Sequence, residues 1–133
     1  MIDMDGKLRA HARQFWKWWD RVQEAGKASP AGHVLSGMGF TIAHTGGGCL
    51  AWERTAGTNY VWITHEADTL GEDVEDVEAA IWDVGVYSAD GDRFSMARPV
   101  TGLRAAIALA EKMLLDPAPY WYEDPADAAP PAA

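Results

Sequence analysis

The sequence predicts an α+β fold in which an antiparallel sheet of about five strands, a β-meander followed by a hairpin, is flanked by an N-terminal and a C-terminal helix. Apolar residues recur three and four positions apart near both ends of the chain, which is the helical period. Between these stretches the period falls to two, and short glycine-containing turns separate the segments. Such short turns favour antiparallel pairing, because parallel strands need a longer crossover. We expect one domain over residues 1–122 and a flexible Pro/Ala-rich tail over 123–133.

The first helix is predicted over residues 6–26, with Asp5 as its N-cap and Gly26 at its end. Its apolar stripe consists of Leu8, Ala12, Phe15, Trp19 and Val22. Most of its basic residues fall on the other faces. The following segment, 27–37, contains a proline and two glycines, and we interpret it as a connector.

Three strands are predicted next. Alternation from Met38 through residue 45 indicates the first, and Gly46-Gly47-Gly48 supplies a tight reversal. The second covers about 49–55, and the third, rich in aromatic and β-branched residues, covers 60–65. The glycine run is not interpreted as a phosphate loop, because a strand-like stretch without lysine follows it.

The second half holds one ambiguous segment. Residues 66–78 form either an acidic loop or, over 73–80, a short helix. A strand over 81–89 then turns at Asp90-Gly91 into another over 93–98, which Pro99 ends. Thr101 is expected to cap the last helix, residues 102–116, whose apolar stripe is Leu103, Ile107, Ala110 and Leu114. We expect both terminal helices to cover the same face of the sheet.

The net charge of −9 is unevenly distributed along the chain. Residues 1–27 carry +2 and the remainder −11, with eight acids and no Lys or Arg between positions 66 and 83. Such a chain repels phosphate backbones and is attracted to basic surfaces. We therefore expect a basic protein partner, such as a nucleic-acid-binding protein, and no direct binding of nucleic acid.

Other classes are excluded by composition. No apolar run reaches the roughly 18–20 residues of a membrane span, and the acidic start lacks the features of a signal peptide. Cys49 is the sole cysteine, so neither an intrachain disulfide nor a cysteine zinc cage is expected. We expect a cytoplasmic protein that does not associate with membranes.

The sequence contains residue types that occur in catalytic and metal-binding sites, but not in the patterns of such sites. His44, His65, Glu66 and Asp68 lack the pattern of a convergent metal site, so no metal or organic cofactor is expected. Cys49 has no neighbouring cation in sequence to lower its pKa. A small enzyme or ligand-binding domain using His44, Cys49 and His65 remains an alternative, with a non-enzymatic function preferred.

The candidate binding residues are acidic and aromatic. Of the seven tryptophans, Trp19, Trp52, Trp62 and Trp82 are explained by core packing, whereas the others either cover the sheet or meet a partner. The residues predicted to contact a partner are Glu66, Asp68, Glu72, Asp73, Glu75, Asp76, Glu78, Asp83, Trp16, Trp18 and Trp121.

The segments His44–Trp52 (HTGGGCLAW), Tyr60–Thr64 and Val84–Tyr87, with Asp90-Gly91, resemble small acidic accessory proteins of phages and prophages. This resemblance implies an inhibitor of host defence, anti-CRISPR proteins among them, that occupies a basic surface of a host protein. If residues 73–80 are helical, the element order instead looks like that of class I type III secretion chaperones. That resemblance implies a homodimer that wraps an effector segment.

Overall fold

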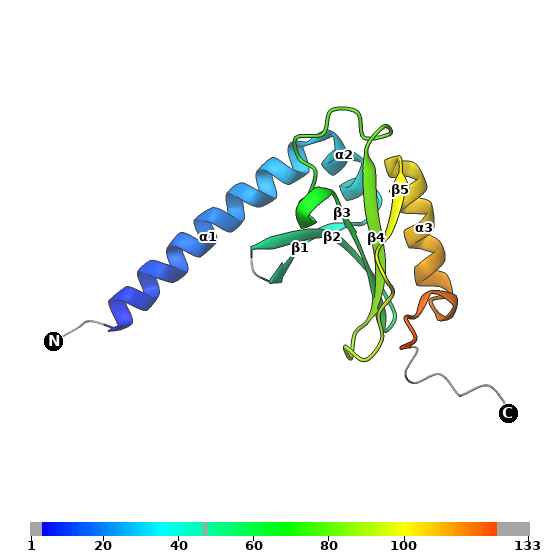
Figure 1. Cartoon of the computed structure of the whole chain (residues 1–133). Helices are drawn as coiled ribbons and strands as arrows, with labels where there is room; N and C mark the ends of the chain where they lie inside the picture. Colours follow the sequence, from blue (N-terminus) through cyan, green and yellow to red (C-terminus); the bar gives the residue numbers. More distant parts are fainter. Residues whose placement is uncertain (1–3, 47, 125–133) are drawn as a thin grey trace, which may run out of the picture.

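The computed structural model describes residues 4–46 and 48–124. The helices are α1 (Met4–Ala28), α2 (Pro30–Gly37) and α3 (Leu103–Leu115), with 3-10 turns η1 (Glu66–Asp68) and η2 (Ala118–Tyr120). The strands are β1 (Thr41–Gly46), β2 (Cys49–Ala56), β3 (Asn59–Thr64), β4 (Ile81–Ser88) and β5 (Arg98–Thr101). They form one antiparallel sheet in the order β1-β2-β3-β4-β5. The predicted α+β fold class is confirmed (Figure 1).

One face of the sheet carries the core. Alternate residues of the strands, among them Trp52, Ile63 and Val84, are fully buried against the apolar sides of α2 and α3. α3 contacts β3, β4 and β5. The predicted stripe of this helix is confirmed, with Leu103, Ile107 and Ala110 buried and Leu114 partly so.

Two core tryptophans also hold the acidic segment to the sheet. The indole N–H of Trp52 donates to the carbonyl of Leu70 at 3.0 Å, and that of Trp82 donates to Val77 at 2.9 Å. Residues 66–80 form η1 followed by turns and contain no α-helix, so the loop interpretation is correct. The element order required for the chaperone resemblance is therefore not formed.

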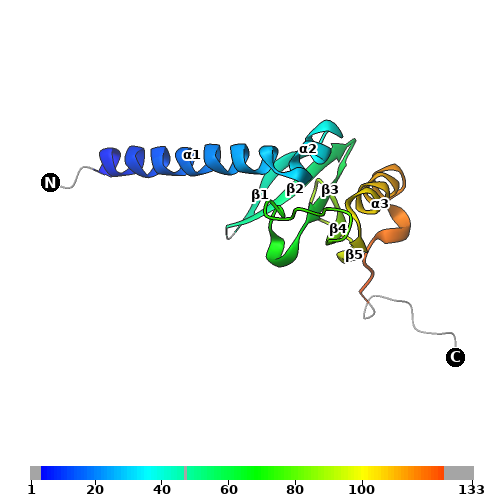
Figure 2. The same ribbon diagram turned by 90° about the horizontal axis from the view of Figure 1, so that it is seen from above.

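α1 does not cover the sheet as predicted. Figures 1 and 2 show its N-terminal half extending away from every other described element, and only its C-terminal end meets the core through Trp19 and Val22. The helix continues to Ala28, so Asp5 and Gly26 lie inside it and are not its boundaries. Gly26 lets α1 approach β1 closely, because a Cβ there would lie 2.6 Å from the Cδ1 of Ile42. The fully buried helical side chains of the core come instead from α2 and α3, among them Leu35, Leu103 and Met113.

The segment predicted as a connector contains α2. Ser29 caps this helix by accepting a hydrogen bond from the Gly32 amide at 3.0 Å, and Pro30 occupies its first turn. Ala31 and Leu35 are completely buried. The prediction was wrong because it treated Pro30 as a helix breaker, although proline is well accommodated in a first turn.

The last strand and the last helix cap also differ from prediction. β5 covers Arg98–Thr101 and contains Pro99, as an edge strand can, whereas Phe94 and Ser95 make only isolated bridges. Thr101 ends this strand, and the N-cap of α3 is Gly102, whose φ is 93°. Within the described residues, no helix has the length and apolarity to cross a bilayer.

Candidate functional site

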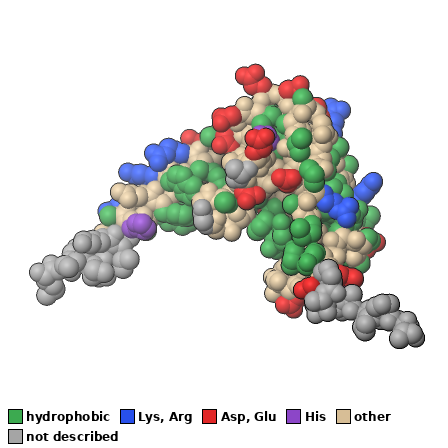
Figure 3. All heavy atoms as spheres, viewed as in Figure 1, with side chains coloured by type: hydrophobic (Ala, Val, Ile, Leu, Met, Phe, Trp, Pro, Cys, Tyr) green, Lys and Arg blue, Asp and Glu red, His purple; other side chains and the backbone are tan. Residues whose placement is uncertain are grey.

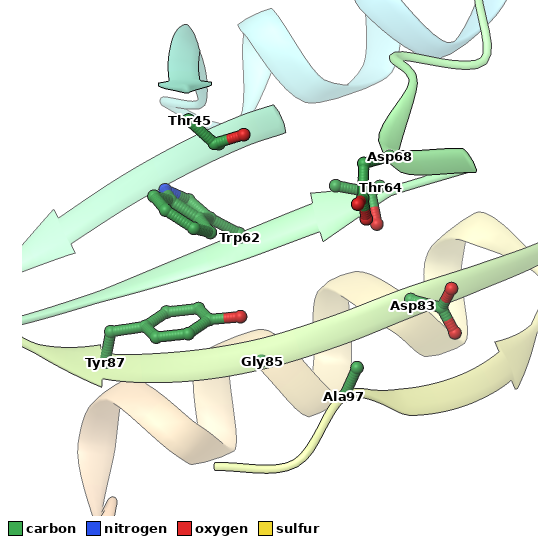
Figure 4. A pocket seen from close by; sticks show the side chains of 8 residues that line it. All are labelled: Thr45, Trp62, Thr64, Asp68, Asp83, Gly85, Tyr87 and Ala97. Carbon is green, nitrogen blue, oxygen red and sulfur yellow. The ribbon is translucent and has the colours of Figure 1, made fainter. Parts of the chain in front are cut away.

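The face of the sheet opposite α3 has a cavity of about 180 Å³ (Figure 4). The 3-10 turn η1 contacts β2 and β4, and its Asp68 lines the cavity. The cavity is lined from β1, β3, β4, η1 and the segment before β5 by Thr45, Trp62, Thr64, Asp68, Asp83, Gly85, Tyr87 and Ala97. Its residues on β3 and β4 alternate with core residues, so strand pleating places them away from α3.

Gly85 creates the floor of the cavity. It pairs with Trp62 on β3, and its lack of a side chain lets the Tyr87 ring lie over it. A Cβ at Gly85 would lie 2.8 Å from the Tyr87 hydroxyl. The cavity therefore depends on glycine at this position.

Aromatic side chains form one end of the cavity. The ring centroids of Trp62 and Tyr87 are 4.6 Å apart, and Tyr60 lies 5.3 Å from each of them. The Trp62 indole N–H donates to a carboxylate oxygen of Glu53 at 2.7 Å, which fixes the orientation of the ring. Trp62 was predicted to belong to the core, and this is wrong because it lies on the other face of the sheet.

Carboxylates form the other end of the cavity. Figure 4 shows Asp68 and Asp83 beside Thr64, away from the two rings. No Lys or Arg lines the cavity, and neither carboxylate has a hydrogen bond or ion pair within the described chain. Asp68 has a φ of 54°, a left-handed conformation that aspartate tolerates better than most residues. The site therefore has uncompensated negative charge.

The tyrosine hydroxyl at this site remains protonated near neutral pH. Burial raises the pKa of Tyr87 above 10.0, and the charges of Tyr60 and Asp68 raise it further. Burial also raises the pKa of Tyr60, with a further contribution from Glu53. Both phenols are thus neutral groups that add no negative charge to the site.

The acidic segment is an exposed loop whose apolar residues Leu70, Val74 and Val77 pack against the core side of the sheet. In Figure 3 several acidic side chains lie on the upper part of the molecule, where Figure 1 shows this loop. Glu78 has a structural role, because its carboxylate accepts from the Arg104 amide at 3.1 and 3.3 Å at the start of α3. Asp76 accepts from the amides of residues 78 and 79. The remaining predicted acids have no side-chain hydrogen bond or ion pair in the described part of the chain: Glu66, Asp68, Glu72, Asp73, Glu75 and Asp83.

The predicted aromatic contacts are not gathered with these acids. Trp16 is 58% exposed on α1, and Trp121 is half-buried against the core beyond α3. Trp18 is half-buried and meets Glu72 and Arg21 around a separate hollow of about 260 Å³. The structure therefore brings together Asp68 and Asp83, and separately Trp18 and Glu72.

The residues of the enzyme alternative do not form a cluster. The exposed His44 ring lies edge-on to Trp18 at 6.0 Å, and the His65 ring lies 5.3 Å from Trp82. Cys49 lies half-buried at the start of β2, opposite Gly46. No hydrogen bond joins these three side chains, and no group of three potential metal ligands occurs among the residues described.

Sequence reasoning missed most of the cavity, including Thr45, Thr64, Gly85 and Tyr87. A signal was present, because Asp83, Gly85 and Tyr87 alternate on one face of a predicted strand. Their pairing with Trp62 depends on strand register, which was not predicted. No family model, no curated protein and no solved structure matches this chain, so the geometry of the site carries the functional argument.

Proposed function

We propose that this protein is a non-enzymatic binding protein that covers a basic surface of a partner protein and takes one arginine side chain of that partner into the cavity. The observation that supports this is the pair of carboxylates, Asp68 and Asp83, without counter-charge beside the rings of Trp62 and Tyr87. A cation over an aromatic face gains about 0.5–1 kcal/mol when exposed and about 2 kcal/mol when desolvated. Arginine fits better than lysine, because its planar guanidinium both stacks on rings and binds carboxylates in a bidentate manner.

The acidic loop extends this binding surface. Its carboxylates Glu72, Asp73 and Glu75 are exposed and would attract a positive partner over a longer range than the cavity does. Such charges mainly speed association, and their effect decreases as salt rises. The cavity would thus supply a specific anchor and the loop would supply steering.

The resemblance to phage accessory proteins suggests the biological setting of this proposal. In that setting the partner is a nucleic-acid-binding host protein in the cytoplasm, and occupying its basic surface blocks it. An anti-CRISPR protein or another inhibitor of host defence acts in this way. The acidity of the chain and its uncompensated carboxylates support this proposal over one in which the protein binds nucleic acid directly.

The test is a titration of the isotope-labelled protein with blocked arginine amide, followed by amide and indole NMR resonances. We expect shifts confined to the cavity, including the Trp62 indole and the Gly85 amide, and weaker shifts with blocked lysine amide. Replacing Asp68→Asn and Asp83→Asn together should abolish them. The matched control, Asp92→Asn with Asp116→Asn, removes the same charge from exposed positions outside the cavity and should leave the titration unchanged. Equal shifts in both double variants, or shifts scattered over the surface, would refute the anchor.

A further inference from the structure

Five aromatic side chains lie on the face of the sheet that holds the cavity. Tyr60, Trp62 and Tyr87 contact one another, with ring centroids 4.6 to 5.3 Å apart. Tyr87 pairs with Phe94 in an antiparallel bridge, which places both side chains on one face of the sheet. The Phe94 ring in turn stacks on Tyr122 with the centroids 5.3 Å apart. We call these five residues the aromatic row.

The aromatic row is accessible from solvent. Phe94 and Tyr122 are 43% and 45% exposed, and the three rings nearer the cavity are half-buried. In Figure 3 hydrophobic side chains gather where Figure 1 shows the lower ends of β3 and β4. The hydroxyls of Tyr60 and Tyr87 have no hydrogen-bond partner among the residues described, so each can donate to a ligand. An apolar surface of this kind is typical of an interaction site.

The charges at the two ends of the row differ. Asp68 and Asp83 lie at the cavity end without a counter-charge in the described chain. At the other end, Arg93 and Glu123 line a hollow together with Tyr122, so their opposite charges cancel there. A complementary ligand therefore has a cation at one end and uncharged, ring-packing side chains along the rest of its length.

The length of the row fits a short extended chain. From Trp62 to Tyr122 the row crosses from β3 to β4, to the Phe94 segment and to the C-terminal segment, which is about 14 Å at 4.7–4.9 Å for each step. A polyproline II helix rises about 3.1 Å per residue, so about five residues cover this distance. Its carbonyls are free to accept from tyrosine hydroxyls, whereas those inside an α-helix are already bonded. Aromatic surfaces are the usual docking sites for proline-rich segments.

We infer that the protein binds a proline-rich segment of its partner in the polyproline II conformation, with the prolines on the aromatic row and an arginine at one end of the segment in the cavity. This inference rests on the proposed function for the arginine, and it adds the composition and conformation of the segment that carries it. Residues 125–133 of this chain also contain prolines, but they include no Lys or Arg and they add the negative charge of Asp127. Neither its own end nor that of a second copy can therefore supply the cation.

The first test compares blocked hexapeptides in NMR titrations of the isotope-labelled full chain. We expect RAPPAP, or the same sequence in reverse order, to bind about tenfold more tightly than RAGGAG. It should shift the resonances of Phe94 and Tyr122 as well as the Trp62 indole. Equal affinities of the proline and glycine peptides would overturn the inference and leave the arginine anchor intact. If blocked arginine amide also fails to bind, the proposed function and this inference both fail.

The second test removes the exposed end of the row. Phe94→Ala with Tyr122→Ala should lower the affinity for RAPPAP to that for RAGGAG and leave the arginine amide titration unchanged. Tyr122→Ala alone, which lies beyond the last helix, should show part of the loss if the double variant is unstable in urea. The matched control, Phe15→Ala with Trp16→Ala, removes two exposed aromatics from α1 and should leave peptide binding unchanged. Equal loss of binding in the two double variants would refute the role of the row.

The other occupants of the row give different results. If RAPPAP does not bind, and deletion of residues 125–133 shifts the Phe94 and Tyr122 resonances of the free protein, the row is occupied by the end of its own chain. If RAPPAP does not bind and the same resonances shift on dilution, the row is occupied by a second copy. Either result would overturn the inference.

Discussion

Glu78 is expected to stabilise the protein through α3 and to contribute little through its surface charge. Its carboxylate accepts from the Arg104 amide at 3.1 and 3.3 Å, in the first turn of a helix whose own N-cap, Gly102, has no side-chain acceptor. Loss of a capping acceptor costs about 0.5–2 kcal/mol, and loss of a negative charge at a helix N-terminus costs about 0.3–1 kcal/mol. The ion pair with Arg104 adds almost nothing, because the Arg104 side chain is 91% exposed and the N–O distance is 3.7 Å. We expect Glu78→Ala to lower the free energy of unfolding by about 1–2 kcal/mol.

Urea unfolding followed by circular dichroism measures this effect. Glu78→Gln keeps an acceptor oxygen and loses the charge, so it should cost less than Glu78→Ala. The control Glu75→Ala removes an exposed acid of the same loop without a hydrogen-bond partner among the described residues, and should change stability by less than about 0.5 kcal/mol. Equal stability of Glu78→Ala and Glu75→Ala would refute the capping role.

Three further predictions concern the cavity and the core. Gly85→Ala places a Cβ 2.8 Å from the Tyr87 hydroxyl, so it should displace the Tyr87 ring and abolish arginine-induced NMR shifts, with a cost in urea unfolding of less than about 1 kcal/mol. Because the folded-state pKa of Tyr87 is raised, its protonated form is favoured by folding, and stability should fall as pH rises above about 10, where the unfolded chain ionises first. Spectrophotometric titration should show Asp68→Asn lowering that pKa, and Tyr87→Phe should reduce the alkaline loss of stability. Trp52→Phe leaves the Leu70 carbonyl without its 3.0 Å hydrogen bond, so hydrogen exchange across residues 66–80 should accelerate more than in β1.

Local pattern was sufficient for most of the secondary structure. The glycines around position 47 end β1 and begin β2, and Gly46 and Gly48 have φ values of 107° and 83° that few other residues adopt. The strands and the two terminal helices could also be predicted from their apolar patterns, because side-chain direction repeats with the period of each element. The start of α2 also has a local signal, since Ser29 followed by Pro30 is a typical helix start.

The candidate site was only partly predictable. Glu72, Asp73 and Glu75 lie in an exposed acidic loop, as a run of like charge with no partner in sequence predicts. The position of Asp83 near Asp68 and Trp62 could not be predicted, because it depends on the β3–β4 register and on the fold of η1. Glu78 could not be recognised as a helix cap, because the Arg104 amide that donates to it lies 26 residues further along the chain.

Composition and local periodicity determined most of the elements, their antiparallel order and the acidity of the loop. Tertiary structure decided which helices cover the sheet, where β5 pairs and what the opposite face holds. The physical reason is that an apolar stripe specifies only that a helix has something to bury, while α1, α2 and α3 compete for one face of limited area. α2 and α3 supply the helical side chains that are fully buried in the core, whereas Phe15 and Trp16 of α1 remain exposed. In the same way, only the strand register places Gly85 beside Trp62 and so creates a cavity that neither residue indicates alone.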